Sequence, residues 1–174
     1  MSNRHLSRTI ALQTLFAWDF NGKKDDNLNS LIADNFSNFA PNFDDGGFVS
    51  DLVRGVAKTY SEIDKHIVKY ATEWPLDQIT AVDRNILRLG LYELLYTEVP
   101  PRVVINEAIE IAKSFGGDAS GKFVNGVLGS LYNDEPEIQK RDNKEEIEAI
   151  KASLEKEKTT SEEEKTEEEF KEAL

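Results

Sequence analysis

Apolar residues recur every three or four positions along most of this chain, which is the spacing of one buried helix face. In the first half the pattern predicts helices over residues 4–20, 28–39 and 48–70, with a proline at position 41 stopping the second. The longest pattern fits one helix or two that meet near Ser61. No stretch of useful length alternates between apolar and polar residues as a half-buried strand does. The pattern therefore predicts an all-α fold.

The next predicted helix is apolar on most of its sides. Trp74–Pro75 ends the preceding run, because a residue before proline is biased away from the helical region. Thr80 and Asp83 have the spacing of a capping box at a new helix start. The apolar positions that follow are Ile86, Leu87, Leu89, Leu91, Leu94 and Leu95. A helix of this composition is predicted to lie at the centre of the fold.

Two more helices are predicted after Pro100–Pro101. Gly116–Gly117 supply the left-handed residues that close the first of them, and Asp118 is expected to cap the N-terminus of the second. Gly126 and Gly129 lie inside that last helix. Because glycine costs about 1 kcal/mol in a helix interior, the two glycines suggest the close approach of another helix.

The composition changes after the predicted helices, so residues 1–133 are expected to form the folded domain and residues 134–174 an appended tail. The tail has a single aromatic residue, Phe170, and acidic runs such as SEEEKTEEEF. So little apolar surface cannot offset the entropy lost on ordering, which predicts a disordered or loosely helical tail.

The negative charge is unevenly distributed between these two parts. The chain has a net charge of −12; residues 1–133 hold 13 Lys+Arg and 17 Asp+Glu, a net of −4, and residues 134–174 hold 8 and 16, a net of −8. The first eighteen residues carry Arg4 and Arg8 and no acidic residue. Asp19 lies just beyond them. A local basic patch is therefore compatible with the acidic total.

Few residues suggest catalysis. The chain has no cysteine, which excludes disulfides and makes zinc unexpected. His5 and His66 lie on different predicted helices, and Glu107 and Glu110, although spaced as bundle carboxylates that bind metals, fall on the exposed side of their helix. The glycines of FGGDASGK lack the lysine spacing and the preceding strand of a phosphate loop. We expect no enzymatic activity, no cofactor and no metal.

No segment approaches the roughly 18 apolar residues of a membrane span. The apolar run near the N-terminus is interrupted by Gln13, Thr14 and Asp19 and is followed by no small-residue cleavage site. We expect a cytoplasmic protein without a membrane partner.

Four segments together resemble the NusB family of bacterial transcription antitermination factors. They are ALQTLFAWDF at 11–20, RNILRLGLYELL at 84–95, INEAIEIAKSFG at 105–116 and KFVNGVLGSL at 122–131. The resemblance runs from about Arg4 to Tyr132. It implies an all-helical fold of two packed helical subdomains, with about seven helices, and no enzymatic activity. Family members bind the boxA element of ribosomal RNA leader transcripts together with NusE, a small-subunit ribosomal protein. Their complex joins RNA polymerase and suppresses premature termination.

The resemblance also implies which residues contact RNA. The arginine-rich N-terminal segment of the family falls on Arg4, His5 and Arg8, where this chain has fewer arginines. Lys122 and Phe123 match a motif at the start of the last helix that lies near the same surface in the family. Cations and aromatic rings suit single-stranded RNA, which is held by phosphate charge and base stacking.

The NusE-facing side of the family falls on Phe16, Asp83 and Asp118 in this chain. Each of the three also has a structural interpretation: Phe16 as a core residue, Asp83 in the capping box and Asp118 as a helix cap. The alternative to an RNA-binding factor is a helical protein–protein adaptor of the same fold in which RNA binding is weakened or lost. Whether the free protein is a monomer or a homodimer stays open.

The acidic tail suggests a further hypothesis. A polyanionic segment tethered to the domain samples the domain surface at high effective concentration, roughly millimolar for a short flexible linker. It would compete with RNA for a basic site, whereas a tail held away from the domain would only aid solubility.

Overall fold

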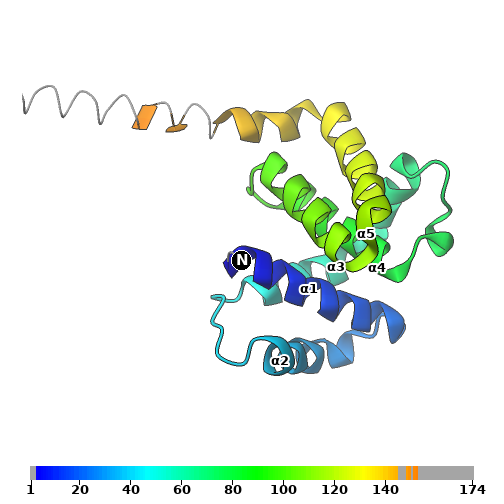
Figure 1. Cartoon of the computed structure of the whole chain (residues 1–174), viewed down its shortest axis with the longest axis vertical. Coiled ribbons are helices and arrows are strands. Elements are labelled where there is room, and N and C mark those ends of the chain that lie inside the picture. The colour runs from blue at the N-terminus through cyan, green and yellow to red at the C-terminus, as the bar shows by residue number, and fades with distance from the viewer. Residues whose placement is uncertain (1–2, 145–147, 150, 153–174) are drawn as a thin grey trace, which may run out of the picture.

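The computed structural model describes residues 3–144, 148–149 and 151–152, and the SEEEKTEEEF run lies outside them. The elements in chain order are α1 (Asn3–Phe20), η1 (Asp25–Asn27), α2 (Leu28–Phe39), α3 (Phe48–Tyr70), η2 (Leu76–Gln78), α4 (Ala81–Tyr96) and α5 (Pro101–Asp134). Residues 136–144 are also helical. None of the described residues lies in a strand, and the predicted all-α fold is confirmed (Figure 1).

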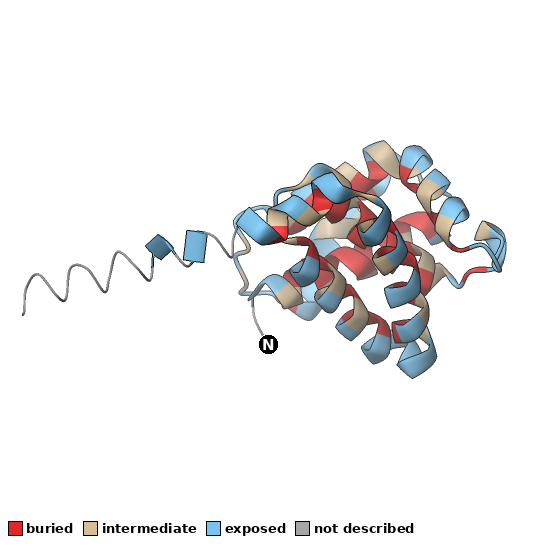
Figure 2. Ribbon diagram, turned by 90° about the horizontal axis from the view of Figure 1, so that it is seen from above, coloured by how far each residue is buried: buried red, intermediate tan, exposed pale blue. Residues whose placement is uncertain are grey.

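The helices pack into two lobes, each with its own buried cluster. The N-terminal lobe is built from α1, α2 and the first half of α3, around Ile10, Leu15, Trp18, Leu52 and Val56. The C-terminal lobe is built from the second half of α3 with α4 and α5, and its core includes Ile63, Ile67, Leu91, Leu94, Val124 and Leu128. Buried residues line the sides of the helices that face one another (Figure 2). The expected two packed subdomains are therefore present.

Helix α4 joins the two lobes, as its apolar sequence predicts. Leu89 belongs to the core of the N-terminal lobe, and Leu87 and Leu91 belong to that of the C-terminal lobe. Polar residues on the same helix are buried as well, among them Asn85, Arg88 and Glu93. These polar groups need internal partners, because an unpaired buried polar group costs free energy.

The closely packed glycines are not those that the sequence suggested. A Cβ on Gly126 would meet nothing within 4 Å, and one on Gly129 would meet only Asn125 Oδ1 at 3.8 Å. The prediction of a close helix approach at these two positions is wrong. The close approach lies instead at Gly55, where a Cβ would be 2.1 Å from the Tyr92 ring, and at Gly90, where it would be 2.9 Å from Leu128.

The helix boundaries resolve one alternative that the sequence left open and correct one predicted cap. Helix α3 is continuous from Phe48 to Tyr70, without a break near Ser61. Gly117, with φ +80° and ψ −172°, interrupts α5 and divides it into two helices. Asp118 already has helical backbone angles, so Gly117 and not Asp118 occupies the capping position. The left-handed residue expected at Gly117 is confirmed.

The helical segment 136–144 packs against the C-terminal lobe, although the sequence analysis placed it in the tail. Ile138 is buried in the lobe's core. Arg141 donates hydrogen bonds to the backbone carbonyls of Leu94 and Thr97 at the end of α4. Asp142 accepts one from the Arg102 backbone N–H in the first turn of α5. The folded part of the chain thus extends beyond residue 133.

Candidate nucleic-acid interface

The predicted RNA-binding arginine Arg8 is buried in an ion pair. Its guanidinium donates three hydrogen bonds of 2.8 to 3.2 Å to the carboxylate of Glu93 on α4. Both side chains are at most 5% exposed. A second carboxylate, that of Glu107 on α5, lies 3.8 Å from the same guanidinium. Arg8 therefore joins α1 to α4 and α5, and its charge is already neutralised within the protein.

His5 lies one turn earlier on α1 and belongs to the same group of residues. Its Nδ1 is 2.8 Å from Glu107 Oε2. We call His5, Arg8, Glu93 and Glu107 the N-terminal cluster. Arg4 is exposed, and its guanidinium lies 4.1 Å from the centre of the Phe48 ring. Of the three predicted RNA-binding residues of this segment, Arg4 is the exposed one.

The other two predicted RNA-binding residues lie at the second helix of α5. Lys122 is exposed and Phe123 is half-buried. Both line an open hollow of about 250 Å³, together with Tyr70, Glu73 and Trp74. Trp74 was predicted only as the end of a helical run, yet the residue is 52% exposed and lines this hollow with Phe123. The signal available in the sequence was a tryptophan directly before a proline, between two predicted helices.

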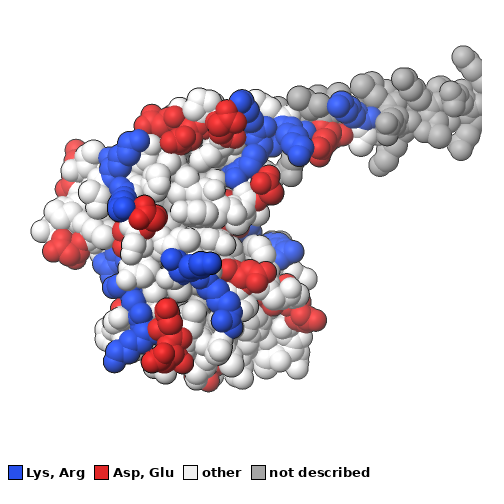
Figure 3. Space-filling view, turned by 180° about the vertical axis from the view of Figure 1, so that it is seen from behind, with Lys and Arg blue, Asp and Glu red and all other residues white. Residues whose placement is uncertain are grey.

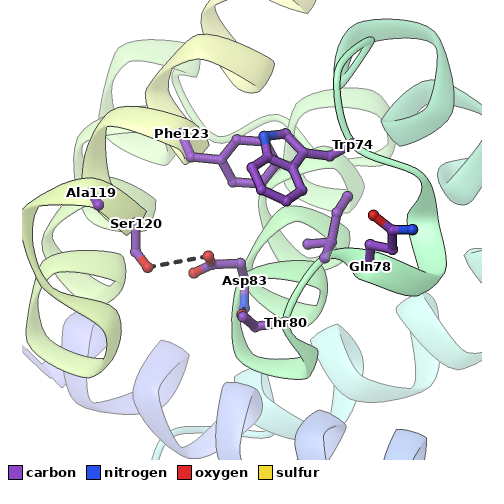
Figure 4. Close-up of a pocket in the computed structure, with 8 residues that line it drawn as sticks. Trp74, Gln78, Thr80, Asp83, Ala119, Ser120 and Phe123 are labelled. Carbon is purple, nitrogen blue, oxygen red and sulfur yellow. Dashed lines mark hydrogen bonds between the residues drawn. The ribbon is translucent and has the colours of Figure 1, made fainter.

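Trp74 and Phe123 also line a neighbouring cavity of about 300 Å³, which we call the Trp74 pocket. Its other walls come from η2, from the start of α4 and from the second helix of α5, through Gln78, Ile79, Thr80, Asp83, Ala119 and Ser120. In Figure 4 the two aromatic side chains lie above Asp83, whose carboxylate points toward Ser120. A predicted RNA-binding residue, Phe123, and a predicted partner-binding residue, Asp83, thus line one cavity.

Asp83 makes one of the two hydrogen bonds of the predicted capping box. Its backbone N–H donates to Thr80 Oγ1 at 3.2 Å, as a helix cap requires. Its carboxylate does not return to Thr80. Oδ2 accepts a hydrogen bond of 3.1 Å from Ser120 Oγ, and Oδ1 is buried without a hydrogen-bond partner. The residue as a whole is 8% exposed.

Phe16 and Asp118, the other residues predicted to face a partner, are both exposed. The ring of Phe16 stacks on that of Phe20 with 6.3 Å between centroids, and Phe20 is 80% exposed. The interpretation of Phe16 as a core residue is therefore wrong. An exposed aromatic pair of this kind is typical of a protein-contact surface.

The C-terminal end of α1 is fixed to α4 by a second set of buried charges, the Asp19 network. Asp19 Oδ2 lies 2.7 Å from Arg84 Nη2 and 3.0 Å from Arg88 Nη1, and it accepts a 3.0 Å hydrogen bond from Asn85. Arg88 in turn pairs with Asp64 on α3 at 2.8 Å. Burial alone would raise the pKa of Asp19, but hydrogen bonds and charge from Arg84, Arg88 and Asn85 outweigh it and hold the pKa at about 2.

On the face that Figure 3 shows, the charge of the folded body is mixed. Lys and Arg lie among Asp and Glu there and do not form one continuous basic patch. Among the described residues, no group of three or more His, Asp or Glu side chains is arranged to hold a metal ion. No helix of the described residues is both long enough and apolar enough to cross a membrane.

These features define a two-lobed all-α protein whose candidate residues, apart from the buried Arg8 and the half-buried His5, lie on the surface or line one of two neighbouring cavities. A comparison with protein families matches residues 5–133 to the NusB family. The chain belongs to the NusB family, as the four sequence segments indicated.

Curated relatives and solved structures agree with this assignment. The transcription antitermination protein NusB of Anaeromyxobacter dehalogenans is 42% identical over 135 residues, covering 78% of this chain and 94% of the relative. That of Solibacter usitatus is 40% identical over 138 residues, covering 79% and 93%. The structure of T. maritima NusB matches with a TM-score of 0.64 and 34% identity over 80% of this chain and 92% of that one. A structure of the antitermination factors NusB and NusE in complex with dsRNA matches with a TM-score of 0.69 and 28% identity over 78% and 99%.

Proposed function

We propose that this protein is a transcription antitermination factor that binds boxA RNA of ribosomal RNA transcripts together with NusE. In this proposal the complex joins RNA polymerase and suppresses premature termination, and it carries out no catalysis. One observation carries the proposal: 78% of this chain matches 99% of a chain from a complex of the antitermination factors NusB and NusE with dsRNA.

The arrangement of the candidate residues supports two separate contact regions. Lys122, Phe123 and Trp74 combine a cation with two aromatic rings, the combination that holds single-stranded RNA by phosphate charge and stacking. The exposed Phe16–Phe20 pair supplies an apolar surface for the protein partner. The two regions lie at the same end of the molecule, because Asp19, on the last turn of α1 with Phe20, bonds to Arg84, next to Asp83 of the pocket.

A mobility shift of labelled boxA RNA with and without NusE tests the proposal. We expect weak binding by the protein alone and tighter binding by the pair, because joined surfaces add their phosphate contacts. A scrambled RNA of the same length and composition is the control for sequence preference. Equal binding with and without NusE would contradict the proposal.

The N-terminal cluster favours a second candidate, the helical adaptor with weakened RNA binding. Arg8 and His5 are paired with Glu93 and Glu107, which reduces the charge available to phosphates. A charge reversal at the exposed cations, Arg4→Glu with Lys122→Glu, separates the two candidates. An RNA-binding factor loses affinity and its binding depends less steeply on salt, since each phosphate contact adds slightly less than one unit to the slope.

An adaptor would be indifferent to the same reversal. Lys58→Glu is the matched control, because Lys58 is an exposed lysine on α3, roughly 15 Å of helix beyond Phe48, where Arg4 stacks. Both sets of variants should keep the wild-type ability to bind NusE, measured by co-elution on size-exclusion chromatography. A loss of RNA binding that is as large in Lys58→Glu would point to a general charge effect.

A further inference from the structure

Phe48, the first residue of α3, lies against two arginines of α1. The centre of its ring is 4.1 Å from the guanidinium carbon of Arg4 and 5.4 Å from that of Arg8. Both distances are within the range of a cation–π contact, about 6 Å. Arg4 and Arg8 are four residues apart on α1, and residues at this spacing are neighbours on one face of a helix. One ring therefore faces two successive turns of α1.

The two arginines differ in what else holds their side chains. Arg8 is buried and its guanidinium is enclosed by the carboxylates of Glu93 and Glu107. Arg4 is exposed, and it forms no ion pair with any residue that the structure describes. The contact with Phe48 therefore restrains the Arg4 guanidinium and leaves its charge for a partner outside the protein.

The position of Phe48 is in turn fixed by its surroundings. The side chain is half-buried and packs against the core of the N-terminal lobe. In the loop before it, Gly46 and Gly47 have φ values of +64° and +86°, in the left-handed region that glycine favours. Asp45 accepts hydrogen bonds from the backbone N–H groups of Gly47 and Val49. The loop thus determines where α3 begins and where the ring stands beside α1.

A guanidinium that rests on an aromatic ring is well suited to a phosphate. The group is planar, so a ring that covers one face leaves the N–H donors at the edge accessible, and a phosphate accepts two of them in parallel. A long side chain that becomes ordered only on binding reduces the affinity, whereas one that is already restrained loses less freedom. The ring therefore prepares Arg4 for a phosphate before any RNA is bound.

We propose that Phe48 is a positioning residue for RNA, whose ring holds the Arg4 guanidinium in place for a phosphate of the strand. The inference rests on the proposed RNA-binding function, in which Arg4 is one of the contacts. Phe48 acts through Arg4 and not by touching the RNA. It was not among the residues that the sequence predicted for RNA binding.

A double-mutant cycle between Arg4 and Phe48 tests this role. Phe48→Leu keeps an apolar side chain against the lobe and removes the ring face. The full-length protein with NusE is titrated with labelled boxA RNA. We expect Phe48→Leu to weaken binding about two- to tenfold, the range for ordering one long side chain. In an Arg4→Ala protein the same substitution should leave the affinity unchanged, because the group that the ring positions is absent.

Phe43→Leu is the matched control. Phe43 is a half-buried aromatic residue of the same loop, it packs against the same lobe, and its ring stacks on that of Phe36 with 6.4 Å between centroids. Its replacement should leave the RNA affinity unchanged with or without Arg4. Phe48→Tyr keeps the ring face and should keep the wild-type affinity, which separates the ring from the bulk of the side chain.

A measurement on the free protein tests the stack without RNA. The δ-methylene protons of Arg4 lie close to the ring, so its ring current should move their signals upfield in a carbon–proton correlation spectrum. Phe48→Leu should return these signals to ordinary positions, and Phe43→Leu should leave them in place. Ordinary Arg4 signals in the wild-type protein would overturn the inference.

Thermal melting followed by circular dichroism checks that Phe48→Leu is folded at the temperature of the titration, and Phe48→Met replaces it if it is not. An unchanged affinity in the folded variant would overturn the positioning role. So would an equal loss with and without Arg4, because the ring would then act on the RNA or on the fold by itself. Either result, in a protein whose wild type binds boxA RNA with NusE, leaves the proposed function standing. Absence of RNA binding by the wild type with NusE would defeat the proposed function and the positioning role together.

Discussion

Each end of α1 is fixed to the rest of the molecule by a buried charged residue, which is positive at the N-terminal end and negative at the C-terminal end. At the N-terminal end an arginine, Arg8, is enclosed by the carboxylates of Glu93 and Glu107. At the C-terminal end a carboxylate, that of Asp19, is enclosed by Arg84, Arg88 and Lys23. In both sets the central charge is buried and has more than one partner of opposite charge within the protein.

The difference between the ends lies in what is left unpaired around them. The N-terminal cluster leaves Arg4 facing solvent, and the Asp19 network stands next to Asp83, whose Oδ1 has no partner. A charged residue in a candidate site is therefore informative only when its internal partners are known. Under the proposed function, the exposed Arg4 is therefore a better candidate for RNA contact than the buried Arg8, although the same basic pattern selected both.

Among the variants that test this comparison, replacement of Arg8 is expected to change the free energy of unfolding most. Arg8→Ala leaves the Glu93 carboxylate buried without a counter-charge, which costs about 3–5 kcal/mol of the free energy of unfolding. Urea denaturation measures the loss. Arg8→Met combined with Glu93→Leu is the control, because replacing both members by apolar side chains is expected to restore most of the stability.

A stable Arg8→Ala protein with impaired RNA binding would break the comparison. It would show that Arg8 leaves its ion pair to contact RNA, as the sequence pattern first suggested.

The acid end of the stability profile tests the Asp19 network. The folded-state pKa of Asp19, about 2, is below its ordinary value of 3.8. Its stabilisation is therefore complete above about pH 4 and is lost as the pH falls toward 2, to a total of about 2 kcal/mol. Urea denaturation between pH 5 and 2 measures the slope, and Asp19→Asn should flatten it by that amount. An Asp19→Asn profile parallel to wild type would contradict the assignment.

Lys122→Ala tests the end of the molecule that holds the Trp74 pocket. If Lys122 neutralises one phosphate, its loss reduces the slope of log affinity against log salt by slightly less than one unit. The measurement is a set of RNA titrations in the presence of NusE from low to physiological salt. Lys113→Ala on the preceding helix of α5, which pairs with Glu110, is a control that should leave the slope unchanged.

Glu107→Gln tests the other end and gives the smallest expected effect. The His5–Glu107 pair is partly exposed, and such pairs contribute about 0.2–1 kcal/mol. Neutralising the carboxylate releases positive potential around Arg4 and His5, so RNA affinity should rise about two- to fivefold at low salt and less at high salt. Glu110→Gln, one turn along on the exposed side of the same helix, is the matched control. An equal gain in both variants would place the effect in the net charge of the protein.

The sequence predicted the fold well because helical periodicity is a local property. The helix pattern, the central position of α4 and the turn at Gly117 follow from residues within a few positions of one another. The close approach of two helices depends on residues that are distant in the chain. For this reason the prediction at Gly126 and Gly129 was wrong. The close contacts of Gly55 with Tyr92 and of Gly90 with Leu128 were not predicted.

The candidate site was less predictable for the same reason. Arg8 and Glu93 are separated by 85 residues in the chain, so no local pattern indicates that the arginine is already paired. Trp74 and Phe123 are likewise far apart in the chain, and only the fold brings them to the two cavities that both of them line. The helical segment 136–144 looked like part of an acidic tail, because its single buried apolar residue, Ile138, gives no periodic signal.

The attachment of α1 at both of its ends sets a length scale for any RNA strand that contacts the surface at both ends of this helix. Between Arg4 and Asp19 the helix extends for about 22 Å, and neither end can swing without breaking a buried ion pair. At the 3.4 Å per nucleotide of a stacked strand, this distance corresponds to roughly six nucleotides. Under the proposed function, an RNA strand shorter than this reaches one end of α1, whereas a longer strand reaches both ends at once.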